Sequence, residues 1–153
     1  MNIFKSLFVL LLPVAFFACK KTEVDQAKVD REIIRQYIRD NGITNADSTA
    51  SGLFYAITDS GVGASPTATS TVWVYYRGSY TTGVTFDQSE AGTPSRISLA
   101  NVIQGWKEGI PLIKKGGEIK LFIPSALGYG TTGSGTIPGN TVLIFNVKLD
   151  NFQ

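Results

Sequence analysis

The chain has 153 residues, of which 43% are hydrophobic and 17% charged, so it can bury the core of one domain with a modest extension. A net charge of +2, with no basic cluster larger than a Lys-Lys pair such as Lys20-Lys21, argues against nucleic acid as a partner. The absence of histidine excludes the commonest general base and metal ligand, and the single cysteine, Cys19, excludes an internal disulfide framework or zinc–thiolate site. We therefore expect neither a metal nor a cofactor.

The N-terminal residues have the pattern of a secretion signal. Lys5 provides a positive start, and the apolar run from Leu7 to Ala18 is too short for a membrane span. The segment resembles bacterial lipoprotein signals, in which the cysteine becomes the lipidated first residue. We predict a signal peptide over residues 1–18 and lipidation at Cys19, which would anchor the protein to a membrane of the bacterial cell envelope. A plain cleaved signal and an uncleaved anchor are the alternatives.

Residues 19–50 are predicted to hold the anchor, a linker and an N-terminal helix. The charged stretch from Lys20 to Asn41 favours a helix, and its apolar side chains recur at helical spacing before Gly42 ends it: Ile33, Ile34, Tyr37 and Ile38. Such a helix either packs on the domain or links it to the membrane, or else it pairs two chains. The apolar stripe is short, which favours a monomer.

Residues 51–153 are predicted to form one domain of strands and turns. Gly78 indicates a bulge or a close backbone approach within its strand, and helix begins near Asn101. A glycine-rich loop follows over residues 125–140. The fold class is α+β, an antiparallel sheet with one short helix. The expected strands are 52–58, 71–80, 96–99, 118–123 and 141–149.

One tryptophan, Trp106, lies in the segment VIQGWKEG from Val102 to Gly109. A buried tryptophan normally needs a partner for its indole N–H, or a role for its ring face. Taken in isolation, Trp106 and Phe145 would be interpreted as residues of the hydrophobic core. Tyr129 is harder to explain in that way, because the glycines on both sides of it give a close-approach backbone that exposes the phenol.

Six motifs occur in an order and spacing that together are highly specific, although each alone is common. The resulting pattern resembles the FKBP-type peptidyl-prolyl cis-trans isomerases over residues 52–152. The motifs are Tyr76-Arg77-Gly78, Phe86-Asp87, Val102 to Gly109, Ala126 to Gly130, Ile137-Pro138 and Leu143 to Phe145.

The resemblance implies a curved antiparallel sheet wrapped around one short helix, with an apolar pocket between them. It implies that Trp106 is the pocket floor and that aromatic walls come from Tyr76, Phe86 and Phe145. All four would be catalytic residues, together with Asp87 and Tyr129.

The same resemblance implies how a ligand is held. Val102 and Ile103 line one side, and the Ile103 backbone N–H meets a substrate carbonyl. Asp87 is the polar group of the wall, although an aspartate after a strand often serves only the turn. Tyr129 donates a hydrogen bond to a ligand carbonyl from the rim, and Ile137 lies on the far lip.

The activity that the resemblance implies is isomerisation of X–Pro peptide bonds in folding envelope proteins. The barrier is roughly 18–20 kcal/mol because resonance gives the C–N bond double-bond character. A dry aromatic pocket favours the twisted, less polar amide over the planar one, and so requires no reactive side chain. Proline-containing polypeptides are then the partners, and macrolides are candidate inhibitors.

Two alternative functions stay open, and the chain departs from the family pattern at two places. The pocket could bind proline motifs or assist folding without catalysis, or the chain could be a purely structural lipoprotein. Pro94-Ser95-Arg96 stands where many family members carry an aromatic residue, so one wall is expected to be less apolar. The small polar loop from Thr131 to Thr136 predicts a more open and mobile rim.

Overall fold

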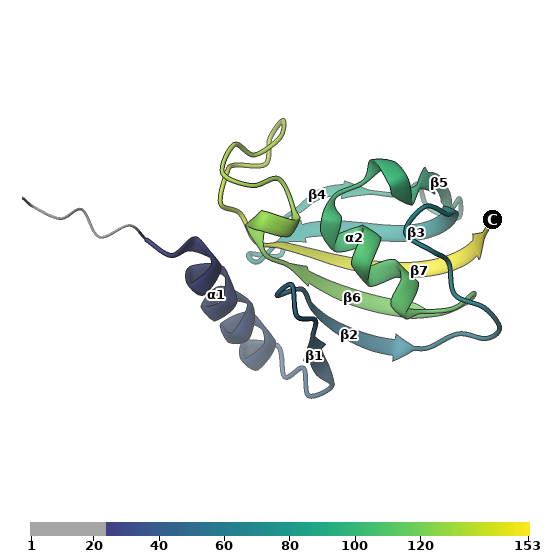
Figure 1. Cartoon of the computed structure of the whole chain (residues 1–153), viewed down its shortest axis with the longest axis horizontal. Helices are drawn as coiled ribbons and strands as arrows, with labels where there is room; N and C mark the ends of the chain where they lie inside the picture. Colours follow the sequence, from purple (N-terminus) through teal and green to yellow (C-terminus); the bar gives the residue numbers. More distant parts are fainter. Residues whose placement is uncertain (1–23) are drawn as a thin grey trace, which may run out of the picture.

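The computed structural model describes residues 24–153, and the predictions for the signal segment and Cys19 lie outside these residues. An N-terminal helix precedes a seven-stranded antiparallel sheet that carries one short helix (Figure 1). The α+β class predicted from the sequence is confirmed. The elements are α1 (Gln26–Asp40), β1 (Ala46–Ser48), β2 (Phe54–Asp59), β3 (Thr71–Tyr80), β4 (Thr85–Gln88), β5 (Ser95–Ser98), α2 (Gln104–Gly109), β6 (Glu118–Ile123) and β7 (Leu143–Phe152).

The sheet has the strand order β1-β2-β6-β7-β3-β4, and β5 also pairs with β3. The two long strands β3 and β7 pair along most of their length at the centre, while β4 and β5 pair with different parts of β3. The pairing of β3 with β4 shifts register at Gly78, in agreement with the bulge that this glycine predicts. The sheet begins at β1, before the domain boundary expected at residue 51.

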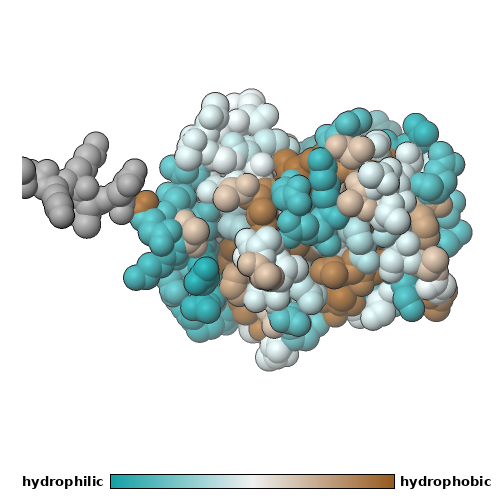
Figure 2. All heavy atoms as spheres, in the orientation of Figure 1, coloured by the Kyte–Doolittle hydropathy of each residue, from teal (hydrophilic) through white to brown (hydrophobic). Residues whose placement is uncertain are grey.

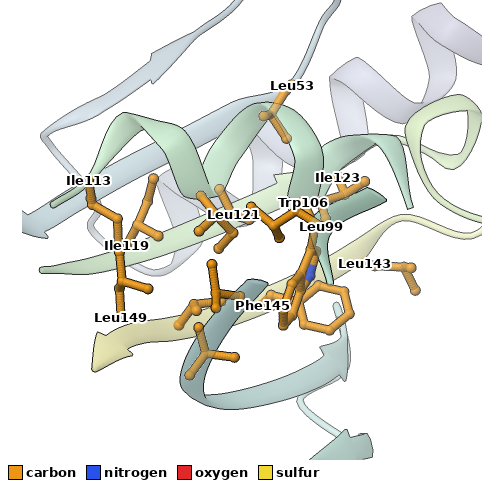
Figure 3. Packing of buried hydrophobic residues seen from close by; sticks show 14 of the residues in the cluster. Leu53, Leu99, Trp106, Ile113, Ile119, Leu121, Ile123, Leu143, Phe145 and Leu149 are labelled. Atoms are coloured by element: carbon orange, nitrogen blue, oxygen red, sulfur yellow. The ribbon is translucent and has the colours of Figure 1, made fainter. Parts of the chain in front are cut away.

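Alternation along the central strands separates two cores, one on each face of the sheet. On β6, Leu121 and Ile123 face α2, whereas Phe122 between them belongs to the core under α1. Figure 3 shows the larger core, where side chains of α2, β6 and β7 meet below the short helix. The sheet is therefore covered on both faces, and the functional residues must lie at the margins of these cores.

Helix α1 is bounded by its caps and docks through one narrow face. Asp25 caps its start by accepting a hydrogen bond from the Lys28 N–H, and Gly42 follows its end with a φ of 61°. Ile34 is fully buried against the sheet, whereas Ile33 is 38% exposed. The outer side of α1 is mostly hydrophilic (Figure 2). The helix thus packs on the domain, one of the roles that its sequence allows.

Helix α2 lies close to the sheet because two glycines face it. A Cβ on Gly105 would come within 2.7 Å of the Ile123 side chain, and one on Gly109 would collide with Leu121. Glycines four residues apart share one helix face, which lets the backbone approach β6 directly. This close approach sets the depth at which Trp106 enters the core.

Two short strands of the sheet are absent from the sequence prediction. β1 and β4 are mainly exposed and polar, so they lack the apolar alternation by which strands are detected. Their pairing comes from their neighbours β2 and β3 instead. None of the helices within residues 24–153 is long and apolar enough to cross a membrane.

Candidate active site

Aromatic side chains from the sheet and the short helix converge at one end of the larger core. Tyr76 comes from β3, Phe145 from β7 and Trp106 from α2, and the last two lie side by side in Figure 3. The Trp106 ring meets the rings of Tyr76 and Phe145 edge to face, each with centroids 5.3 Å apart. Such edge-to-face contacts are favourable for aromatic pairs and hold the three rings in one arrangement.

A second aromatic layer supports the first. Phe86 of β4 packs edge to face against Phe145 with centroids 5.6 Å apart, and Tyr80 lies 5.1 Å from Phe86. Gly78 makes this layer fit, because a Cβ there would come within 2.7 Å of both phenylalanine rings. The close approach that the sequence predicts at Gly78 is therefore present, together with the bulge.

The rings border a cavity of about 210 Å³. This volume is below the roughly 300–1,000 Å³ of pockets that enclose drug-sized ligands, so the cavity suits a single small ring or side chain. The residues that line it are Tyr76, Asp87, Ile97, Asn101, Val102, Ile103, Trp106, Tyr129 and Phe145.

Most of the residues predicted for the site meet at this cavity, and two do not line it. Phe86 stands behind Phe145, and Ile137 is 9% exposed and belongs to the core instead of the lip. Ile97 and Asn101 line the cavity without having been predicted. The alternation of Ile97 with its polar neighbours in β5 is a signal that could have identified it, whereas nothing in the sequence marks Asn101.

One carboxylate lies among the hydroxyl groups at the cavity. The Tyr76 hydroxyl donates a 2.8 Å hydrogen bond to Asp87 Oδ2. Burial, this hydrogen bond and the negative charge of Asp87 raise the pKa of Tyr76 to about 12. Burial and the same charge also raise the pKa of Tyr129 above its ordinary value. Both phenols therefore remain protonated donors across the neutral pH range.

Three donors at the cavity have no acceptor among residues 24–153. The Ile103 N–H precedes α2 and forms no hydrogen bond, and the Tyr129 hydroxyl likewise has no hydrogen-bond partner within this part of the chain. The Trp106 indole N–H is buried without a partner. Buried polar groups are normally paired, so the buried Trp106 indole N–H beside a cavity indicates a place where a ligand can supply an acceptor.

The loop that carries Tyr129 is more closely bonded than its small polar sequence predicts. The Tyr80 hydroxyl donates to the Thr136 carbonyl at 3.1 Å, and Ser134 and Ile137 exchange backbone hydrogen bonds. Ser95 of β5 pairs with Val74 and does not line the cavity. Ile97, two residues later, provides the apolar surface on that side.

Comparisons with known proteins relate most of the chain to one family. Residues 63–150 match the family model described as FKBP-type peptidyl-prolyl cis-trans isomerase. The chain is 40% identical over 141 residues to the FKBP-type peptidyl-prolyl cis-trans isomerase FkpA of Aeromonas hydrophila, covering 87% of the chain and 53% of that protein. It is 37% identical over 131 residues to FkpA of Escherichia coli K12, covering 85% and 47%. The chain thus spans about half the length of these curated relatives.

Solved structures show the same fold. The crystal structure of FkpA from Escherichia coli superposes with a TM-score of 0.74 at 36% identity, covering 84% of this chain and 61% of that one. A peptidyl-prolyl cis-trans isomerase from Pseudomonas syringae superposes with a TM-score of 0.70 at 28% identity, covering 86% and 98%. With the family model matching more than half of its residues, the chain belongs to the FKBP-type peptidyl-prolyl cis-trans isomerase family.

Proposed function

We propose that the chain is a peptidyl-prolyl cis-trans isomerase that binds proline in the cavity above Trp106. The observation that carries the proposal is the cavity itself, a space of about 210 Å³ bordered by three interlocked rings with unpaired donors beside it. An apolar ring fits the floor, and the carbonyl groups that flank it find the Ile103 N–H and the Tyr129 hydroxyl. The substrates are proline-containing segments of other polypeptides.

The proposed mechanism is differential binding of the twisted amide. In the planar ground state, resonance places negative charge on the carbonyl oxygen, and twisting the C–N bond removes that resonance. Aromatic walls provide little solvation for the planar, more polar form, and the Asp87 carboxylate at the wall disfavours further negative charge nearby. The barrier falls because these interactions are less unfavourable in the transition state.

Orientation contributes a second part of the rate. Edge-to-face packing of Trp106 with Tyr76 and Phe145 keeps the floor fixed, and the Tyr76 hydroxyl fixes the Asp87 carboxylate. A substrate held by a fixed floor and two donors reaches the twisted geometry with less loss of freedom in the transition state. Macrolides, whose rings carry carbonyl groups, are candidate inhibitors at the same donors.

A protease-coupled assay on X–Pro peptides tests the activity. The wild-type chain should accelerate isomerisation, and Asp87→Leu and Phe145→Ala should each lower kcat/KM by about tenfold or more while leaving the fold intact. Asp47 provides a matched control, because its carboxylate also meets a tyrosine hydroxyl, that of Tyr55, far from the cavity. Asp47→Leu should keep wild-type activity.

The outcomes separate catalysis from binding. Wild-type rates equal to the uncatalysed rates would overturn the enzyme proposal, and peptide binding without acceleration would then favour a proline-binding or chaperone module. Full activity in both cavity variants would mean that catalysis occurs elsewhere on the chain.

We further propose that the protein acts in the bacterial cell envelope as a lipoprotein anchored through Cys19. The apolar run before the lone cysteine and the Lys20-Lys21 pair after it support this placement. Cys19→Ser should move the protein from the membrane fraction to the soluble fraction of cells that express it. Retention of the variant in the membrane fraction would exclude Cys19 as the attachment point.

A further inference from the structure

Asp30 on α1 carries a buried carboxylate, and both of its oxygens accept hydrogen bonds. The residue is 1% exposed, and Asp30 Oδ2 accepts hydrogen bonds from the Ser125 backbone N–H at 2.8 Å and the Ser125 hydroxyl at 2.6 Å. Asp30 Oδ1 accepts one from Gln26 Nε2 at 2.7 Å. No cation of residues 24–153 pairs with it. An unpaired buried charge is costly, so this carboxylate calls for an explanation beyond packing.

Ser125 begins the short helical turn η3 (Ser125–Leu127) and organises the backbone around Tyr129. It is 3% exposed, and its carbonyl accepts hydrogen bonds from the Gly128 N–H at 3.0 Å and the Gly130 N–H at 2.8 Å. These two glycines flank Tyr129. The Gly130 carbonyl in turn accepts from the Asn140 N–H at 2.8 Å, which closes the loop. One serine therefore sets the backbone on both sides of the rim tyrosine.

Helix α1 does not need this contact in order to dock. Ile34 is fully buried in the core under α1, and the Tyr37 ring packs on Phe122 with centroids 5.9 Å apart. An apolar residue at position 30 could extend that contact without burying a charge. The carboxylate instead supplies one oxygen that accepts both the N–H and the hydroxyl of a single serine, which fixes the orientation of η3.

We propose that Asp30 is a positioning residue for the active site: through Ser125 it holds Tyr129 at the cavity rim, so that α1, packed on the opposite face of the sheet, supports substrate binding. The proposal rests on the proposed isomerase function and assigns a role to the N-terminal helix in it. Tyr129 is the endpoint because it lines the cavity and its hydroxyl has no partner among the described residues. A misplaced Tyr129 should therefore weaken substrate binding more than it slows isomerisation of the bound substrate.

The test uses the full chain in steady-state isomerisation assays. Asp30→Ala and Ser125→Ala should raise KM about three- to tenfold, the change expected for loss of one neutral hydrogen bond to substrate, with kcat within twofold of wild type. Asp30→Asn keeps one acceptor oxygen toward Ser125 and should recover part of the loss. Asp40→Asn, an exposed acid on the same helix, is the matched control and should leave KM unchanged.

A double-mutant cycle separates positioning from general destabilisation. In a Tyr129→Phe background, Asp30→Ala should produce little further rise in KM, because the hydroxyl that it positions is already absent. Hydrogen exchange at the Gly128 and Gly130 amides should also accelerate in Asp30→Ala while the amides of β6 stay protected. If Asp30→Ala fails to fold, Ser125→Ala answers the same question with the helix untouched.

Unchanged KM in folded Asp30→Ala or Ser125→Ala, or losses that add fully to that of Tyr129→Phe, would overturn the proposal. A wild-type chain without isomerase activity would instead overturn the proposed function. In that case hydrogen exchange alone tests whether Asp30 positions the rim loop. Unchanged hydrogen exchange at the Gly128 and Gly130 amides in Asp30→Ala would overturn that positioning role as well.

Discussion

At the scale of single residues, the site depends on hydroxyl and amide groups more than on reactive side chains. The Tyr76 hydroxyl donates to Asp87 at 2.8 Å, and Tyr129 lies near the same carboxylate. The chain has no histidine, which is the side chain whose ordinary pKa lies nearest neutrality. The chemistry we propose therefore needs these phenols to keep their protons.

The raised pKa of Tyr76 predicts the pH dependence. Its pKa is about 12 in the folded protein against an ordinary 10.0, so above pH 10 the folded chain holds a proton that the unfolded chain has lost. The free energy of unfolding contributed by this group is thus present below pH 10 and is lost as the pH rises from 10 toward 12. Isomerase activity should stay constant from about pH 6 to pH 9 and fall only in the alkaline range.

Urea unfolding and peptide assays across this pH range check both statements. Tyr76→Phe removes the titrating group and should flatten its part of the alkaline decline in stability. A bell-shaped activity profile centred near neutrality would contradict the assignment of Tyr76 and Tyr129 as phenols that stay protonated.

At the scale of elements, the position of α2 decides where Trp106 lies. Gly105 and Gly109 let the helix backbone approach β6, and Trp106 enters the cavity region from the same turn. A glycine-to-alanine change in a helix ordinarily stabilises by up to about 1 kcal/mol. Here the added methyl group meets the Ile123 side chain at 2.7 Å, so the expected sign is reversed.

Gly105→Ala should therefore lower the free energy of unfolding by about 1–3 kcal/mol, the usual range for overpacking. Ile123→Ala should be destabilising by itself, through the cavity that it leaves. The double variant should be less destabilised than the sum, because the smaller side chain makes room for the new methyl group. Additive losses in urea unfolding would show that the helix can shift away from β6 without strain.

The same elements show what could be predicted from the sequence. The strands around Val74 and Leu121 have β-branched and apolar residues with clear boundaries, and their predicted ends match β3 and β6. The aromatic set Tyr76, Trp106 and Phe145 follows from the resemblance to the FKBP family, which rests on the order and spacing of six motifs along the chain. Tyr80 is missed because its proximity to the site arises from packing on Phe86, which no local pattern encodes. The alternation around Ile97 marks one face of its strand, but only the pairing of β5 with β3 brings that face to the site.

The Asp30–Ser125 contact could not be predicted for a related reason. The two residues are 95 positions apart, and each has an ordinary local explanation, as a helix acid and as the first residue of a turn. Only the packing of α1 on the outer face of the sheet brings them together.

At the scale of the whole molecule, α1 and the sheet are joined by their own core. This core contains Ile34, Phe122 and Ile144, all of them fully buried. It is separate from the larger core under α2, which Figure 3 shows. A helix with such a contact should unfold together with the sheet instead of earlier.

Ile34→Ala should lower the free energy of unfolding by about 2–5 kcal/mol, as for other large-to-small changes in cores. Ile33→Ala, at the adjacent and 38% exposed position, is the matched control and should lower it by less than half as much. Both variants should retain a single urea transition by circular dichroism. Equal losses, or an early transition of helix alone, would show that α1 is only loosely attached.

The central claim is that the cavity above Trp106 holds the prolyl ring. Titrating the ¹⁵N-labelled chain with an X–Pro peptide, and following amide and indole resonances by NMR, tests it most directly. We predict that the Trp106 indole N–H and the Ile103 amide show the largest shift changes, since neither has an acceptor among the described residues. Saturable shift changes confined to other surfaces, with these two resonances unmoved, would contradict the account.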